Sequence, residues 1–119
     1  MANQSTGGAI VNIADWAVER PYKDYSAYFV SKGSIPTMTR VFAVELSPKV
    51  RVNAILPGPV LMPTDLPQQV RERAVQGTLV QRAGRPENIA HAVLFLAQND
   101  FVTGVCLPVD GGRTIGETD

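Results

Sequence analysis

The chain has 119 residues, of which 45% are hydrophobic and 18% are charged, and its formal net charge is zero. This length allows one small domain with a core of its own. The balanced charge favours neither a nucleic-acid nor a membrane partner, and no apolar run is long enough to span a bilayer. A single cysteine excludes an internal disulfide, and the polar N-terminus lacks the apolar segment of a signal peptide, so we expect a cytoplasmic protein.

The first half of the chain predicts a strand, a loop and a long helix. An apolar run at residues 9–14 is typical of a buried strand, and residues 15–25 read as a loop. A helix is expected from about residue 26 to 46, with an apolar stripe formed by Tyr28, Ile35, Met38, Phe42 and Leu46. Pro36 lies inside this helix and crowds the carbonyl of Lys32, so we expect a kink or a loosened turn there.

The second half predicts two more strands separated by helices. A strand is expected at residues 50–56, followed by a long connection over residues 60–83 with a short helix at about 67–76. Pro86 suits the first turn of a further helix, whose buried stripe is Ile89, Ala92, Val93 and Leu96. Residues 101–109 lead into a third strand. Strands that alternate with helices indicate a parallel α/β sheet.

Tyr28 and Lys32 stand four residues apart, so a helix places them on one face, one turn apart. The unperturbed pKa of a phenol is about 10. A nearby ammonium lowers it, which would make Tyr28 a usable proton donor. Asp15 follows the first strand and is expected to face the same crevice. The plain alternatives are a surface pair on a helix for Tyr28 and Lys32, and a turn or N-cap role for Asp15.

Several landmarks in this order resemble the short-chain dehydrogenase/reductase family. Tyr28-Phe-Val-Ser-Lys32 is similar to its Tyr-x-x-x-Lys motif, and Gly8-Ala-Ile-Val-Asn-Ile13 to the strand before that motif. Arg51-Val-Asn-Ala-Ile-Leu-Pro-Gly58 and Val109-Asp-Gly-Gly112 are similar to later landmarks. The resemblance implies that residues 1–119 are a partial domain, the C-terminal half of a doubly wound parallel-sheet (Rossmann-like) α/β fold. The Gly-rich cofactor-binding N-terminal half is absent from this sequence.

Asp15 departs from most of the family, which has Ser at this position. Asp with Trp16 beside it resembles the pteridine reductases, in which Asp, Tyr and Lys act together on a pterin or folate ring. This resemblance implies an NADPH-dependent oxidoreductase with Asp15, Tyr28 and Lys32 as catalytic residues and a small pterin-like molecule as substrate. Asp15 would bind the substrate. Trp16 would either wall the substrate pocket or simply pack.

The resemblance also implies a nicotinamide cofactor, NADP or alternatively NAD. Tyr28 and Lys32 would contact its ribose end. Pro57-Gly58-Pro59-Val60 resembles the family loop whose backbone meets the nicotinamide carboxamide, which assigns Pro57, Gly58 and Val60 to cofactor binding. The plain alternative for this loop is a turn that ends a strand, and both roles can hold together.

Two other functions stay open at this point. One is an ordinary ketone or acyl-chain reductase of the same family. The other is a non-catalytic fragment that acts as an interaction module, because a half-sheet exposes a strand edge that recruits partners. The family's subunit interfaces imply a homo-oligomer. His91 and Cys106 are read as ordinary structural residues, and no metal site is predicted.

Overall fold

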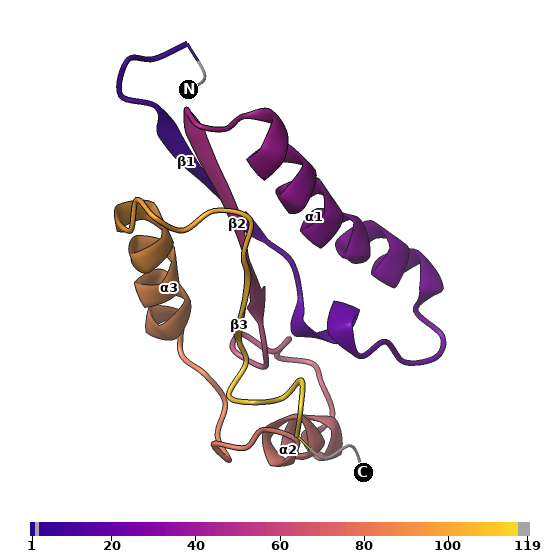
Figure 1. Cartoon of the computed structure of the whole chain (residues 1–119). Helices are drawn as coiled ribbons and strands as arrows, with labels where there is room; N and C mark the ends of the chain where they lie inside the picture. The colour runs from indigo at the N-terminus through magenta and orange to yellow at the C-terminus, as the bar shows by residue number, and fades with distance from the viewer. Residues whose placement is uncertain (2, 117–119) are drawn as a thin grey trace.

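The computed structural model describes residue 1 and residues 3–116, and it contains one three-stranded parallel sheet. The strands lie in the order β1, β2, β3, with Ile10 opposite Val52 and Ile55 opposite Leu107. The elements in chain order are β1 (Gly8–Ile13), the 3₁₀ helix η1 (Trp16–Glu19), α1 (Ser26–Glu45), β2 (Val50–Pro57), α2 (Gln68–Gln76), α3 (Pro86–Gln98) and β3 (Cys106–Val109). Helices α1 and α3 cover opposite sides of the sheet (Figure 1). The predicted parallel α/β architecture is confirmed.

Most predicted boundaries agree with the structure to within two residues, and one local expectation was wrong. Helix η1 occupies part of the segment that was predicted to be a loop. Helix α1 continues through Pro36, and the kink or loosened turn expected beside Lys32 stays a prediction. Proline removes only one hydrogen-bond donor from a helix. Here the Pro36 ring is buried, so its packing offsets part of that loss.

The predicted apolar stripe of α1 was also wrong in part. The buried residues of this helix are Pro36, Thr39 and Ala43, whereas Met38 and Phe42 stay 37% and 38% exposed. Small side chains on the buried face let the helix backbone approach the sheet closely. Asn12 of β1 fastens the helix further, because its Nδ2 donates a hydrogen bond to Thr39 Oγ1 at 3.1 Å. The larger apolar side chains are consequently left on the outer surface of α1.

Strand β2 forms the centre of the core. Val52, Ala54, Ile55 and Leu56 are fully buried, as expected for a strand with helices on both sides. Val50 and Val52 pack with Ala43 of α1, with Ile10 and Leu46 at the edge of this cluster. The predicted stripe of α3 is confirmed at Leu96, which is fully buried, and its other members are partly buried.

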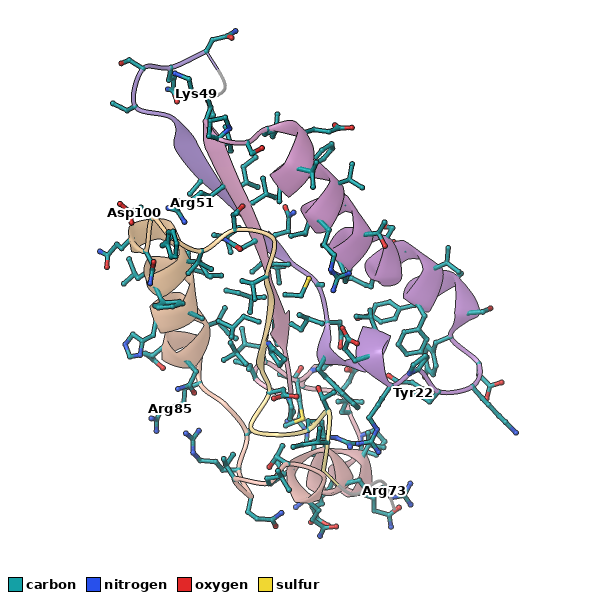
Figure 2. The ribbon with its side chains drawn as sticks, viewed as in Figure 1. Tyr22, Lys49, Arg51, Arg73, Arg85 and Asp100 are labelled. Atoms are coloured by element: carbon teal, nitrogen blue, oxygen red, sulfur yellow. The ribbon has the colours of Figure 1, made fainter. Side chains whose placement is uncertain are left out.

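Arg51 points to the other side of β2, toward α3. Its guanidinium donates to the carbonyls of Leu96 and Ala97 at 2.7 and 2.8 Å, near the C-terminal end of that helix. Figure 2 shows Arg51 beside this helix end, where Asp100 also lies. The last carbonyls of a helix lack partners within the helix, so Arg51 both satisfies them and fixes α3 against the sheet. No helix in the described residues is long and apolar enough to cross a membrane.

Candidate active site

The carboxyl ends of the three parallel strands meet at one edge of the sheet, where α/β proteins commonly bind ligands. Asp15 follows β1, the turn from Pro57 to Val60 follows β2, and Asp110 follows β3. A hollow of about 540 Å³ lies at this edge. Its lining includes Asp15, Trp16, Tyr22, Tyr25, Pro57, Gly58, Val60, Leu66, Val70, Arg73 and Arg113. The structure therefore brings five of the seven predicted site residues to one place.

Asp15 uses its two carboxylate oxygens for different partners. Oδ1 accepts a hydrogen bond from the backbone N–H of Ala17 at 2.9 Å, which caps η1. Oδ2 accepts a hydrogen bond from the hydroxyl of Tyr28. The N-cap role and the contact with Tyr28 thus hold together, and the cap fixes the orientation of the carboxylate that Tyr28 meets.

Tyr28 lies near the start of α1, with its side chain 39% exposed. Partial burial, the hydrogen bond to Asp15 and the negative charge of Asp15 together raise the pKa of Tyr28 to about 12. The expected direction, a pKa lowered by Lys32, is wrong for this arrangement, because partial burial and the Asp15 carboxylate both disfavour the phenolate. Tyr28 is therefore protonated at neutral pH, and in this arrangement its proton is donated to Asp15.

Lys32 lies one helical turn after Tyr28 and is half-buried. It makes no hydrogen bond or ion pair with any residue in the part of the chain that the structure describes. Neither Lys32 nor Tyr28 is among the residues that line the hollow. Tyr28 is connected to the hollow through Asp15, and the ammonium of Lys32 stays available for a group bound beside α1.

The turn from Pro57 to Val60 depends on a close backbone approach at Gly58. A Cβ atom on Gly58 would lie 2.6 Å from Cα of Asp110, closer than real Cβ contacts. The Gly58 N–H donates to the Val109 carbonyl at 3.0 Å, which extends the pairing of β2 and β3 into the turn. Glycine at this position lets two strand ends meet and leaves the backbone of the following residues at the wall of the hollow.

Trp16 lines the hollow and also packs, so both alternatives for this residue hold. The guanidinium carbon of Arg113 lies 4.5 Å from the centre of the Trp16 ring. Tyr22 adds aromatic surface beside it and meets Tyr25 and Phe29 edge to face, with ring centres 5.4 and 4.9 Å apart. This wall was missed in the sequence, although the aromatic residues of the 15–25 segment were a usable signal.

Two arginines of the hollow were also missed. Arg73 lines the hollow, and Figure 2 shows it on α2 at the same end of the molecule as Tyr22. Arg113 directly follows the Gly111-Gly112 turn after β3. A basic residue at the carboxyl end of a strand was the signal that could have found it.

His91 and Cys106 are the two residues that we expected to be ordinary structural residues. His91 is exposed on α3. Cys106 is half-buried in β3, and burial raises the pKa of its thiol. A protonated thiol is a poor nucleophile, so the structure gives no support for a reactive Cys106.

Comparisons with known proteins agree with this geometry. Residues 1–114 match the family model described as enoyl-(acyl carrier protein) reductase. Dihydromonapterin reductase of Escherichia coli O6:K15:H31 is 36% identical over 104 residues, which are 87% of this chain and 43% of that protein. FolM alternative dihydrofolate reductase 1 from Brucella canis, solved in complex with NADP, superposes with a TM-score of 0.83 at 32% identity and covers 96% of this chain and 45% of its own.

A short-chain type dehydrogenase/reductase from Mycobacterium ulcerans superposes with a TM-score of 0.86 at 28% identity, over 95% of this chain and 44% of that chain. In each case the chain spans less than half the length of the relative it matches. The fold is shared with these solved structures. The chain belongs to the short-chain dehydrogenase/reductase family.

Proposed function

We propose that this chain carries the substrate-binding and proton-donating half of an NADPH-dependent reductase that acts on a pterin-like substrate. The observation that carries the proposal is the position of Asp15, whose carboxylate lines the hollow and accepts the hydrogen bond of Tyr28. A pterin ring presents N–H groups to a binding site, and an ionised carboxylate accepts such groups. The matches to a dihydromonapterin reductase and to FolM support this substrate class.

Tyr28, Lys32 and Asp15 each have a separate chemical role in the proposed reaction. Tyr28 is the proton donor, and its raised pKa means that the phenolate left after donation must be stabilised by another group. Lys32, one turn away, stabilises the phenolate that results, because an ammonium favours the charged form. Asp15 orients the substrate by accepting hydrogen bonds from the N–H groups of the substrate ring. Helix η1 holds Asp15 in place through the Ala17 N–H.

The residues at the strand ends fit the nicotinamide end of the cofactor. The close approach at Gly58 leaves the backbone from Pro57 to Val60 at the wall of the hollow, and Lys32 is free of partners in the described residues. When bound, the nicotinamide supplies the hydride. NADP is the cofactor we propose, in line with the FolM complex, and NAD is the alternative. The sequence has no G-x-G-x-x-G turn to hold the diphosphate.

A second candidate is reduction of a ketone or an acyl chain, which the description of the matching family model favours. Exchanging Asp15 for Ser separates the two candidates. Serine is also a good N-cap, so η1 should persist in the Asp15→Ser variant. Serine can donate to a ketone oxygen, but it cannot supply the carboxylate that accepts ring N–H groups.

The test measures NADPH consumption by this chain fused behind the N-terminal part of the Escherichia coli relative that the alignment leaves uncovered. The readout is kcat/KM for a dihydropterin divided by kcat/KM for a small ketone. A lost charge-assisted hydrogen bond should lower this ratio roughly ten- to a hundredfold in Asp15→Ser. An unchanged ratio would reject the pterin assignment and leave the ketone or acyl-chain reductase.

A further inference from the structure

Arg113 lies in a turn whose backbone is fixed by two glycines and by hydrogen bonds to Asp110. Gly111 and Gly112 adopt φ values of +61° and +82°, which L side chains rarely tolerate. The carboxylate of Asp110 accepts hydrogen bonds from the N–H groups of Gly112 and Thr114 at 3.0 and 2.8 Å. These bonds fix the backbone on both sides of Arg113, so the position of its side chain is set by the fold.

A second contact ties this turn to the wall that carries Trp16. Arg20, which directly follows η1, donates from Nη1 to the carbonyls of Thr114 and Gly116 at 2.8 and 2.5 Å. Gly77 leaves room for the Arg113 guanidinium, since a Cβ on Gly77 would lie 2.5 Å from its central carbon. Segments from three parts of the chain therefore converge to hold the Arg113 guanidinium on Trp16.

One end of that guanidinium is left without a partner. Nη1 of Arg113 is buried, and it makes no hydrogen bond with any described residue. Burying a polar group without a hydrogen bond is costly, and an unsatisfied buried group in a folded protein calls for an explanation. Arg113 also lines the hollow that holds Asp15. Nη1 itself is covered, with Gly77 against it, so a ligand in the hollow supplies the missing acceptor once the Arg113 side chain shifts toward it.

The charges of the hollow indicate the chemistry of that acceptor. Its ionisable lining contains one carboxylate, Asp15, and two guanidinium groups, Arg73 and Arg113. A guanidinium matches the geometry of a carboxylate or a phosphate, and stacking on an aromatic ring holds it flat for such a contact. A neutral ring bound to Asp15 would leave Nη1 of Arg113 without an acceptor.

We propose that Arg113 is a specificity-determining residue that binds an oxyanion, a carboxylate or a phosphate, carried by the substrate beside the group that Asp15 binds. The oxyanion subsite is inferred from Arg113, Trp16 and the lining of the hollow alone. Only its place next to a pterin ring rests on the proposed function. The substrate favoured by this site is a pterin with an anionic side chain, in preference to one with a neutral side chain.

The test uses the 119-residue chain itself, because Trp16 is its single tryptophan. Any ligand that engages Arg113 should change the emission of the indole on which the guanidinium lies. The probes are inorganic phosphate and glutarate, which do not absorb at the excitation wavelength, titrated at constant ionic strength set with chloride. Saturation by phosphate or by glutarate identifies which oxyanion the site takes.

Arg113→Gln removes the charge and keeps a polar side chain of related shape, and Arg40→Gln, an exposed arginine on α1 outside the hollow, is the matched control. We expect Arg113→Gln to raise the dissociation constant of the probe that saturates the site about tenfold or more. We expect Arg40→Gln to leave that constant unchanged. Arg113→Lys keeps the charge but lacks the planar, forked guanidinium, so its affinity for the probe should lie between those of Arg113→Gln and Arg40→Gln. Thermal melts show whether each variant is folded.

A second pair of titrations separates this proposal from the proposed function. Dihydrofolate has a carboxylate-bearing side chain, and dihydromonapterin has a neutral one. Tighter binding of dihydrofolate that is lost in Arg113→Gln supports the subsite and the pterin assignment together. Binding of the small oxyanions alone supports the subsite and rejects the pterin. No saturable response of wild-type Trp16 to either oxyanion, or equal affinities in wild type and Arg113→Gln, would overturn the subsite.

Discussion

The hydroxyl of Tyr28 donates a hydrogen bond to Oδ2 of Asp15, thirteen residues earlier in the chain. This bond joins the start of α1 to the carboxyl end of β1, the two elements that deliver the proposed catalytic residues. Asp15 is at the same time held by the N–H of Ala17. The proton of Tyr28 is therefore directed at the group that we propose to bind the substrate, and the ionisation of Tyr28 depends on Asp15.

The first prediction follows from that dependence. Asp15→Asn removes the negative charge that, together with partial burial, raises the pKa of Tyr28 to about 12. The pKa of Tyr28 should therefore fall toward the ordinary phenol value of about 10. The measurement is the pH dependence of tyrosinate absorbance, with Tyr28→Phe variants of both chains to identify the signal. An unchanged midpoint would mean that Asp15 does not control Tyr28.

The same shift predicts how stability depends on pH. The pKa of Tyr28 is raised in the folded chain, so its contribution is fully present below the unfolded value of about 10. It is lost as the pH rises toward the folded value of about 12. Between these limits the melting temperature should fall more steeply in wild type than in Tyr28→Phe. Parallel melting curves for the two chains over this pH range would contradict the coupling.

The second prediction concerns proton donation. Tyr28→Phe keeps the ring and deletes the transferable proton. In the fusion that carries the N-terminal part of the relative, turnover should fall roughly a hundredfold or more, while NADPH binding persists. Single-turnover kinetics with separately measured cofactor affinity provide the readout. Near-normal turnover would move the acid elsewhere, and Asp15 would be the first residue to examine.

The sequence predicted the architecture well because the relevant signals are local or periodic. The apolar run of β2 indicated a strand buried on both faces, and Pro86 marked the start of α3. The landmarks around Asp15, Tyr28 and Gly58 indicated the family and the edge of the sheet where its residues meet. Of these, the structure brings Asp15 and the Gly58 turn to one hollow and connects Tyr28 to it.

The failures concern features that depend on contacts distant in the chain. The face of α1 that is buried is chosen by close approach to the sheet, so Thr39 and Ala43 are inside while Phe42 stays outside. The pKa of Tyr28 is raised by partial burial and by Asp15, thirteen residues away, whereas spacing along a helix reveals only Lys32. Arg113 meets Trp16 across nearly the whole length of the chain, so no local pattern could reveal that contact.

The third prediction tests the close approach that shapes the turn after β2. In Gly58→Ala the new methyl group would meet the Asp110 backbone at 2.6 Å, so the strand ends must move apart. The free energy of unfolding should fall by about 1–3 kcal/mol, as for other overpacked sites. Gly33→Ala is the control, because its Cβ would meet nothing within 4 Å on helix α1. There alanine should stabilise by up to about 1 kcal/mol, measured by urea unfolding. Equal effects at both positions would refute the close approach.

The fourth prediction concerns cofactor affinity. This sequence lacks the Gly-rich turn that holds the diphosphate of a dinucleotide, and the cofactor contacts that we propose are those at the nicotinamide end. We expect it to bind NADPH in the millimolar range or more weakly, corresponding to about 4 kcal/mol of binding free energy. Calorimetric titration of the purified chain gives the value. A micromolar dissociation constant would show that the diphosphate is held by residues we have not identified.

The last prediction is that the chain associates with itself at micromolar concentration. In the described part of the chain, β1 is paired on one side only, and such edges recruit further strands. Helix α1 adds an apolar outer surface, with Val30 and Val44 about three-quarters exposed. Exposed apolar patches of this kind mark association surfaces, so we expect oligomers in sedimentation velocity experiments.

Val44→Lys should weaken the oligomers if the helix face is the interface, whereas Ile115→Lys, at a similarly exposed apolar residue outside α1, should not. Association that survives Val44→Lys would point to the β1 edge and to an interaction module. A folded wild-type monomer at these concentrations would contradict both surfaces, because each predicts an apolar or unpaired area that a second copy would cover.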